Sequence, residues 1–170
     1  MILLVGSTSS GKTLFAKQLQ EYVTKGSVLP ESDILTTIPT VGTNMSTLQI
    51  SRKDAVDIRE LGGSMAPIWR KYYKNADSVV FLVDKSNPQQ LSAASILLFD
   101  MLTDHLLTDV PFLVVWNKID SRNCMSSGYI KNILDLDLIK NYASQKIDSV
   151  ECSSVTGEGF GSIVTWLKQL

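Results

Sequence analysis

Short apolar runs alternate with helix-like patterns along this chain. The clearest runs, at residues 1–6, 78–84 and 111–120, are rich in Val, Ile and Leu and are predicted to be buried strands. Between them, apolar residues recur every three or four positions, as they do on one face of a helix. Nearly continuous apolar strands separated by helices are typical of a mostly parallel sheet that is covered by helices on both faces.

Further strands are predicted at residues 45–51, 54–60 and 149–154, and the first two are close enough to form a hairpin that adds one antiparallel edge. The predicted helices cover residues 12–24, about 90–106, about 129–145 and 160–170. A chain of 170 residues is long enough for one domain with a proper core. We therefore expect an α/β fold with a single domain over residues 1–170.

Composition excludes several classes of protein. The formal net charge of −1 argues against a general nucleic-acid-binding protein, which is usually basic. No apolar run approaches the roughly 18 residues of a membrane span. Cys124 and Cys152 are the only cysteines, which is typical of a reducing compartment, so we expect a cytoplasmic protein. His105 is the only histidine, so a His-based metal site or a Ser-His-Asp triad is poorly supported.

The most informative motif is "GSTSSGKT", which fits the phosphate-binding pattern G-x-x-x-x-G-K-[ST] and lies between a predicted strand and a predicted helix. In this pattern the backbone N–H groups surround phosphate oxygens, and the helix N-terminus adds its positive end. The lysine reaches the β- and γ-phosphates, and the last hydroxyl can bind Mg²⁺. The loop comprises Gly6, Ser7, Thr8, Ser9, Ser10, Gly11, Lys12 and Thr13.

A second motif, "NKID", indicates which base is bound. Asn117, Lys118 and Asp120 follow a buried strand, where ligands of open α/β sheets bind. An ionised aspartate only accepts hydrogen bonds, so Asp120 suits the paired N–H donors of guanine and not adenine. The stem of Lys118 can lie against the base plane. In "CSSVTGEG", the N–H groups of Ser153, Ser154 and Val155 are candidate donors to the guanine carbonyl oxygen.

The ordered set "GSTSSGKT", "PTVG" (39–42), "ELGG" (60–63), "NKID" and "SSV" resembles the small GTPases. Within them, "TIPTVGTN", "GGSMAPIWRKYY" and "FLVDKSNP" resemble the Arf-like branch, and the resemblance runs along essentially the whole chain. It implies the P-loop NTPase fold, GTP or GDP and Mg²⁺ as cofactors, and effector proteins that bind through two switch segments. An exchange factor and a GTPase-activating protein are possible further partners.

The resemblance also assigns roles to single residues. Thr40 would be the switch I threonine that meets Mg²⁺ and the γ-phosphate, and Gly63 the switch II glycine that senses this phosphate. Glu60 stands where most relatives carry a metal-linked aspartate; Asp57 is the rival, but no glycine follows it three residues later. Thr13, Thr40 and Glu60 are therefore the predicted metal set. Lys12, Thr40, Gly63 and Ser64 are the predicted catalytic set.

Ser64 is the main departure from the family pattern, because relatives carry there the glutamine that orients the attacking water. A serine is too short for this task, so slow hydrolysis and a switch function are expected. A readily turning-over GTPase remains the alternative. A P-loop ATP-dependent kinase is a weaker one, which "NKID" opposes.

Two further departures concern the rest of the chain. Ile2 stands where the family's myristoylated glycine would be, and no C-terminal lipidation motif is present, so no lipid anchor is expected. The stretch between Thr13 and Thr40 is longer than usual for the family. It is interpreted either as a tolerated surface insertion or as a partner-binding extension of switch I.

Overall fold

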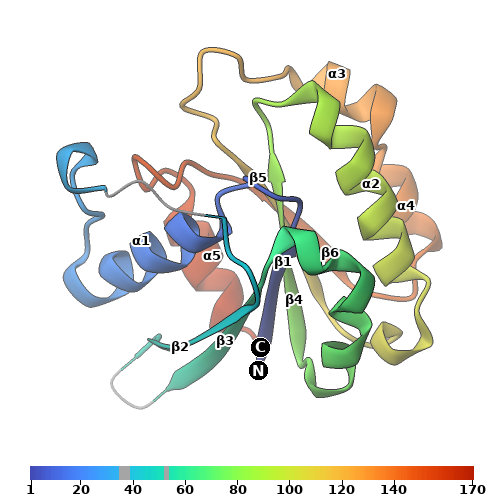
Figure 1. Ribbon diagram of the computed structural model, residues 1–170, viewed down its shortest axis with the longest axis horizontal. Coiled ribbons are helices and arrows are strands. Elements are labelled where there is room, and N and C mark those ends of the chain that lie inside the picture. The colour runs from blue at the N-terminus through green and yellow to red at the C-terminus, as the bar shows by residue number, and fades with distance from the viewer. Residues whose placement is uncertain (35–38, 52–53) are drawn as a thin grey trace.

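A six-stranded sheet forms the centre of the molecule (Figure 1). The computed structural model describes residues 1–34, 39–51 and 54–170. The strand order is β2-β3-β1-β4-β5-β6, and only β2 runs antiparallel to its neighbour, β3. The strands are β1 (Ile2–Gly6), β2 (Thr43–Gln49), β3 (Ala55–Leu61), β4 (Ser78–Asp84), β5 (Phe112–Asn117) and β6 (Ile147–Glu151). The predicted α/β class and antiparallel edge are confirmed.

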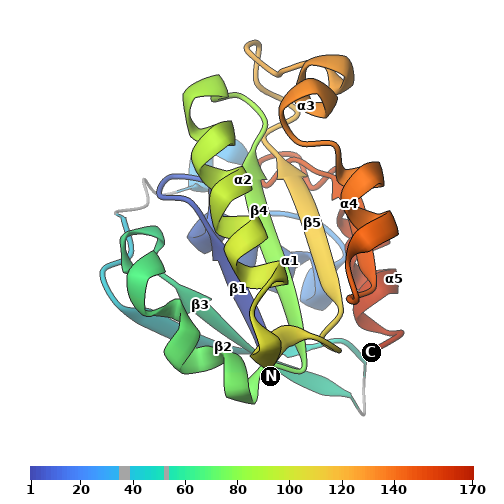
Figure 2. The same ribbon diagram turned by 90° about the vertical axis from the view of Figure 1, so that its right-hand side faces the viewer.

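Helices cover both faces of this sheet (Figures 1 and 2). On one face lie α1 (Lys12–Lys25) and α5 (Phe160–Leu167). Their side chains Phe15, Leu19 and Phe160 belong to one core cluster. On the other lie α2 (Pro88–Leu102), α3 (Ser127–Ile133) and α4 (Leu136–Tyr142), together with the 3₁₀ segment η2 (Gly63–Asn75). Two short 3₁₀ segments complete the described elements, η1 (Glu31–Asp33) and η3 (His105–Leu107). Among the described residues, no helix is both long and apolar enough to cross a membrane.

The predicted helix at 129–145 is wrong in one respect, because the chain forms two helices there. Leu134 adopts an extended backbone and its side chain is buried. Asp135 then caps α4, since its carboxylate accepts a hydrogen bond from the N–H of Leu138 at 3.1 Å. A short polar side chain that bonds to the backbone competes with the continuous helix, and the apolar periodicity alone does not reveal this.

The helix predicted at 90–106 also ends earlier, at Leu102. Asp104 accepts a hydrogen bond from the N–H of Leu106 at 3.0 Å and so begins η3, in which His105 is exposed. The strand predicted at 111–120 ends at Asn117, because Lys118 has a left-handed backbone with φ of 68°. The strand therefore ends one residue into the "NKID" sequence, at the carboxyl edge of the sheet.

The two cysteines are free thiols in different surroundings. Cys152 follows β6, is fully buried, and its Sγ–H donates to Oδ1 of Asn117 at 3.5 Å. Burial, reinforced by the negative charge of Asp120, raises the pKa of the Cys152 thiol to about 12. Cys124 is half-buried in the loop after β5.

We expect iodoacetamide at pH 8 to modify Cys124 but not Cys152 in the folded protein, because the thiolate is the reactive species and Cys152 is both buried and protonated. Intact-mass spectrometry should show one adduct in the native state and two after denaturation in guanidinium. Two adducts that form at similar rates in the native protein would contradict the assigned burial.

Candidate nucleotide-binding site

The loop between β1 and α1 has the form predicted for phosphate binding. Gly11 closes it in a left-handed conformation, with φ of 95°, directly before the first turn of α1. A Cβ atom at Gly11 would lie 2.6 Å from Nδ2 of Asn117, so only glycine fits there. The loop therefore depends on a residue more than a hundred positions away in the sequence.

Lys12 lies inside this loop and is almost fully buried. Its ammonium donates to the carbonyl oxygens of Gly6 and Ser7 at 2.9 and 2.8 Å, and to Oγ of Ser10 at 3.4 Å. Burial lowers the pKa of Lys12 to about 8, and the negative charge of Glu60 partly opposes this effect. A cation so poorly solvated is a strong partner for a phosphate group.

Two hydroxyls and one carboxylate meet beside Lys12. The hydroxyl of Thr13 lies 2.9 Å from that of Thr40 and donates to Oε1 of Glu60 at 2.5 Å. Thr40 also lies 3.0 Å from this oxygen, and Nδ2 of Asn44 donates to the other carboxylate oxygen at 3.1 Å. The structure thus brings together all three residues of the predicted metal set, from α1, the 39–42 segment and β3.

Oxygen atoms of this kind fit Mg²⁺, which prefers hard ligands and is held in phosphate sites by only one or two protein groups. Within the described ranges, no group of three or more His, Cys, Asp and Glu side chains is arranged to hold a metal. The threonine hydroxyls with Glu60 are therefore the candidate cation ligands in the cleft.

Gly63 brings the predicted switch II segment into contact with the phosphate loop. A Cβ atom at Gly63 would lie 2.3 Å from the backbone nitrogen of Thr8. The preceding Gly62 donates from its N–H to the carbonyl oxygen of Gly42 at 3.0 Å and accepts from the indole of Trp69 at 3.0 Å. Trp69, one of the aromatic residues of η2, is buried. Ser64 begins this segment after Gly63 and is exposed.

Asn117 joins the phosphate loop to the loop after β6. Its Nδ2 donates to the carbonyl oxygen of Ser10 at 2.9 Å, and its Oδ1 accepts from the N–H and the hydroxyl of Ser154 at 3.1 and 2.9 Å. Lys118 adds a second link, because its ammonium donates to the carbonyl oxygen of Ser9 at 2.8 Å and to Asp84 at 2.7 Å. The predicted base-binding and phosphate-binding residues therefore form one connected unit.

The loop after β6 differs from the expectation in one detail. The N–H of Ser153 donates to the carbonyl oxygen of Glu158 at 3.0 Å, and that of Ser154 donates to Asn117. The N–H of Val155 donates to Oγ of Ser153 at 3.2 Å. All three predicted guanine donors are thus engaged within the protein, and a bond to the base requires that one of them be shared or exchanged. Asp120 is exposed and free to meet a ligand from solvent.

Two contributing residues were missed by sequence reasoning. Asp84, at the end of β4, accepts from the N–H and hydroxyl of Ser86 with one oxygen and pairs with Lys118 through the other. Its signal was available, since a carboxylate that ends a wholly apolar strand needs a partner. Asn44, which holds Glu60, carried no such signal because it lies in an exposed, polar strand.

The cleft at this edge of the sheet has a volume of about 310 Å³. The phosphate loop, Pro39, Thr40, Glu60, Gly63 and Lys118 line it. Ser64 is not among the described residues that line it, although Gly63 beside it is.

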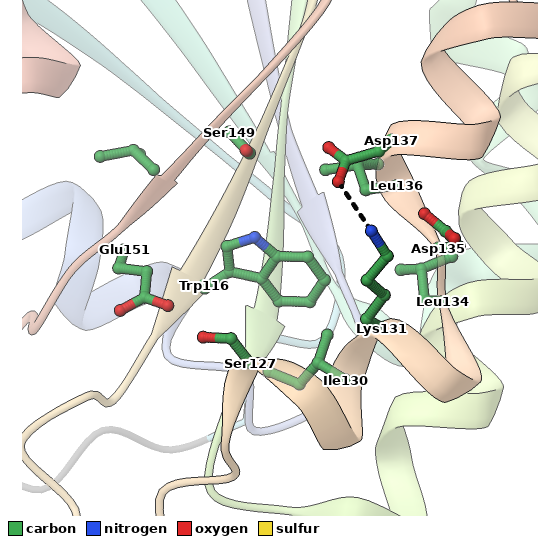
Figure 3. A pocket seen from close by; sticks show the side chains of 11 residues that line it. Trp116, Ser127, Ile130, Lys131, Leu134, Asp135, Leu136, Asp137, Ser149 and Glu151 are labelled. Atoms are coloured by element: carbon green, nitrogen blue, oxygen red, sulfur yellow. Dashed lines mark hydrogen bonds and ion pairs between the residues drawn. The ribbon is translucent and has the colours of Figure 1, made fainter.

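A second cavity of about 260 Å³ lies between α3, α4 and β6 (Figure 3). It has the Trp116 indole at its centre and the Lys131–Asp137 ion pair, 3.3 Å long, at its side. Because both partners of this pair are largely exposed, it adds little stability. None of the predicted site residues lines this cavity.

Comparison with known proteins agrees with this geometry. The chain is 39% identical to human ADP-ribosylation factor-like protein 16 over 168 residues, which is 99% of this chain and 84% of that protein. It is 30% identical to ADP-ribosylation factor-like protein 3 of Caenorhabditis elegans, over 98% of this chain and 84% of the relative.

Among solved structures, the Arl6 (BBS3) small GTPase of Trypanosoma brucei, which contains the nucleotide analogue GppNp, has a similar fold. The TM-score is 0.80 at 24% identity, and the match covers 99% of this chain and 94% of that one. The sequence profile of the ADP-ribosylation factor family matches residues 1–170. The chain therefore belongs to the ADP-ribosylation factor family, with the fold of a small GTPase.

Proposed function

We propose that this protein is a guanine-nucleotide-dependent molecular switch of the Arf-like type, which binds GTP and GDP with Mg²⁺ and recruits effectors in the GTP state. The observation that carries the proposal is the meeting of Thr13, Thr40 and Glu60 at one point. These residues belong to the phosphate loop, switch I (residues 39–42) and switch II (residues 60–75). A ligand at this point contacts all three segments, and family membership makes a nucleotide phosphate the natural candidate.

The phosphate end of the nucleotide would lie in the loop of residues 6–13. Lys12 supplies a poorly solvated cation, and the N-terminus of α1 directs backbone N–H groups toward the same space. Thr13, Thr40 and Glu60 would hold Mg²⁺, Glu60 through a water if its longer side chain requires it. The ion would supply charge neutralisation between the β- and γ-phosphates.

The base would lie between Lys118 and the loop after β6. Asp120 would accept both guanine donors, while adenine would leave this carboxylate without partners. Asn117 acts indirectly in this scheme, because it fixes the phosphate loop and the base loop relative to each other.

The response to the γ-phosphate would come from Thr40 and Gly63, which contact the phosphate loop from the two switches. A ligand shifts a conformational equilibrium only if it contacts the two states differently, and these contacts provide that difference. Val41 in switch I, Met45 in β2 and Ile68 in switch II expose 92%, 52% and 37% of their surface. We propose that effectors bind this area. The two free cysteines are typical of a reducing compartment, and we therefore propose a cytoplasmic location.

Two other activities compete with a slow switch. A readily turning-over GTPase would need a residue that orients the attacking water, and Ser64 is exposed and short. A P-loop kinase that uses ATP would not need Asp120 after Asn117 and Lys118. The switch is therefore the function that the site supports best.

Replacing Asp120 with alanine should weaken GTP binding by about 2–5 kcal/mol, since the charged acceptor for both guanine donors is lost. ATP binding should change little. The measurement is competition against a fluorescent guanine nucleotide. Asp109→Ala is the matched control, because Asp109 is an exposed carboxylate that precedes the first residue of β5, at the strand end away from Asp120. Equal displacement by ATP and GTP in the wild type would show that the base assignment is wrong.

Removing Mg²⁺ with a chelator should accelerate nucleotide release, because the phosphate charges lose their neutralising partner. Thr13→Asn should impair GTP binding more than GDP binding, since it disrupts the set that includes Thr40. Thr24→Asn, in the last turn of α1, controls for the substitution itself. A release rate that is the same with and without chelator would refute the metal role.

Hydrolysis of bound GTP should be slower than about 3–5 × 10⁻⁴ per second, the unaided rate of a small GTPase that has its glutamine. Single-turnover measurement on protein pre-loaded with GTP tests this, with and without cell extract. A rate on the order of 10⁻² per second, typical of an enzyme with an arginine in cis, would mean that a residue other than Ser64 positions the water. Ser64→Gln alone need not restore hydrolysis, because by the family resemblance the segment from Gly63 to "PIW" is shorter than in typical Arf-like proteins, and the new side chain would then be aimed differently.

A further inference from the structure

Residues 26–34, which follow α1 and precede switch I, fold back against the domain, and we refer to them as the strap. Gly26 ends α1 in a left-handed conformation, with its N–H donated to the carbonyl oxygen of Tyr22 at 2.8 Å. A tolerated surface insertion would need no specific contacts beyond this turn. Among the described residues, the strap instead makes specific contacts both to α1 and to the loop after β6.

The first contact is a pair of hydrogen bonds from Gln18. This side chain of α1 is fully buried, and its amide meets the backbone of Leu29 on both sides. The N–H of Leu29 donates to Oε1 at 2.8 Å, and Nε2 donates to the carbonyl oxygen of Leu29 at 3.2 Å. A buried amide is costly unless it is hydrogen-bonded, so Gln18 holds the strap in one position on the helix.

The second contact is made by Val28 on Gly157, in the loop that follows β6. A Cβ atom at Gly157 would lie only 2.7 Å from Cγ1 of Val28, so the valine side chain lies directly over the glycine backbone. Gly157 in turn donates from its N–H to the carbonyl oxygen of Ser153 at 2.9 Å. The hydroxyl of Ser153 accepts from the N–H groups of Val155 and Thr156. Val28 therefore covers the turn that contains Ser153 and Val155.

The other side of this turn is attached to rigid parts of the fold. Phe160 follows the loop, donates its N–H to the carbonyl oxygen of Gly157 at 3.1 Å, and packs edge-on against Phe15 and Tyr22 of α1. Ser154 is held by Asn117. The loop after β6 is thus fixed at both ends. Among the described residues that surround it, those of the strap rest on only a few contacts.

We propose that the strap retains the bound guanine nucleotide, with Gln18 and Val28 as positioning residues that keep the loop 153–157 against the base. This inference rests on the proposed function. Neither residue touches the phosphates; both act through the loop, so the loss of either contact should accelerate release of the base. In the sequence, only four residues separate the strap from switch I, the segment proposed to respond to the γ-phosphate.

The test is the dissociation rate of a fluorescent GDP from the full chain in the presence of Mg²⁺. Gln18→Leu removes both hydrogen bonds and should raise the rate about tenfold, the factor that corresponds to one or two ordinary hydrogen bonds. Val28→Ala removes the methyl groups over Gly157 and should raise it by a smaller factor. In the double variant, the GDP dissociation rate should rise by less than the product of the two single-variant factors, because either change alone already loosens the strap.

Gln20→Leu is the matched control, since Gln20 lies on the same helix but bonds to Thr24 within it. Its dissociation rate should equal that of the wild type. Inorganic triphosphate with Mg²⁺ serves as a probe of the phosphate loop alone, and its affinity should be unchanged in the strap variants. Hydrogen exchange at the Leu29 amide should become faster in Gln18→Leu, because its acceptor is gone.

Unchanged GDP dissociation in both Gln18→Leu and Val28→Ala would overturn the proposal, and Val28→Ala alone decides it if the buried Gln18 variant does not fold. A parallel loss of triphosphate affinity would also overturn it, since the damage would then lie in the phosphate loop. These outcomes differ from failure of the proposed function, which would appear as wild-type protein that does not prefer GDP to ADP. That last result would overturn both.

Discussion

The buried amide of Asn117 is the contact on which the rest of the site depends. It comes from the end of β5 and hydrogen-bonds to the phosphate loop after β1 and to the loop after β6. Because a buried amide is stable only when its donors and acceptors are satisfied, each loop has one position in which this side chain is paired. The requirement for glycine at position 11 follows from the same contact, since any side chain there would collide with the amide.

Glu60 has a comparable role on the other side of the cleft. It is buried, and its oxygens are shared among Thr13, Thr40 and Asn44, so its charge is distributed over three polar groups from different segments. Its side chain reaches the hydroxyl of Thr13 in the first turn of α1. The negative charge of Glu60 also partly offsets the loss of hydration at Lys12, which reduces the cost of burying this ammonium group.

The strands and the residues of the phosphate loop could be predicted because their signals are local. Apolar runs such as residues 78–84 and the spacing of Gly6, Gly11 and Lys12 need no knowledge of distant residues. What could not be predicted depends on pairs far apart in sequence: Asn44 with Glu60, Asp84 with Lys118, and Gln18 with Leu29. The split of the helix at Leu134 belongs to a third kind, in which a single capping side chain outweighs apolar periodicity. The roles that rest on family resemblance, above all that of Ser64, concern the rate of a reaction and not an arrangement of residues. Kinetic measurements are therefore needed to test them.

Slow hydrolysis and a retained nucleotide have a common consequence. A switch returns to its resting state either by cleaving its γ-phosphate or by losing the nucleotide, and the rates of these two routes are set by different parts of this molecule. We propose that Ser64 limits the first route, because its side chain is too short to orient the attacking water, and that the strap limits the second, because its contacts with α1 and Gly157 keep the base loop in place. If both routes are slow, the lifetime of either state is controlled by partners and not by the chain itself. On this proposal, the segment before switch I contributes to the timing of the switch, because the strap contacts the base loop and precedes Thr40 in the sequence.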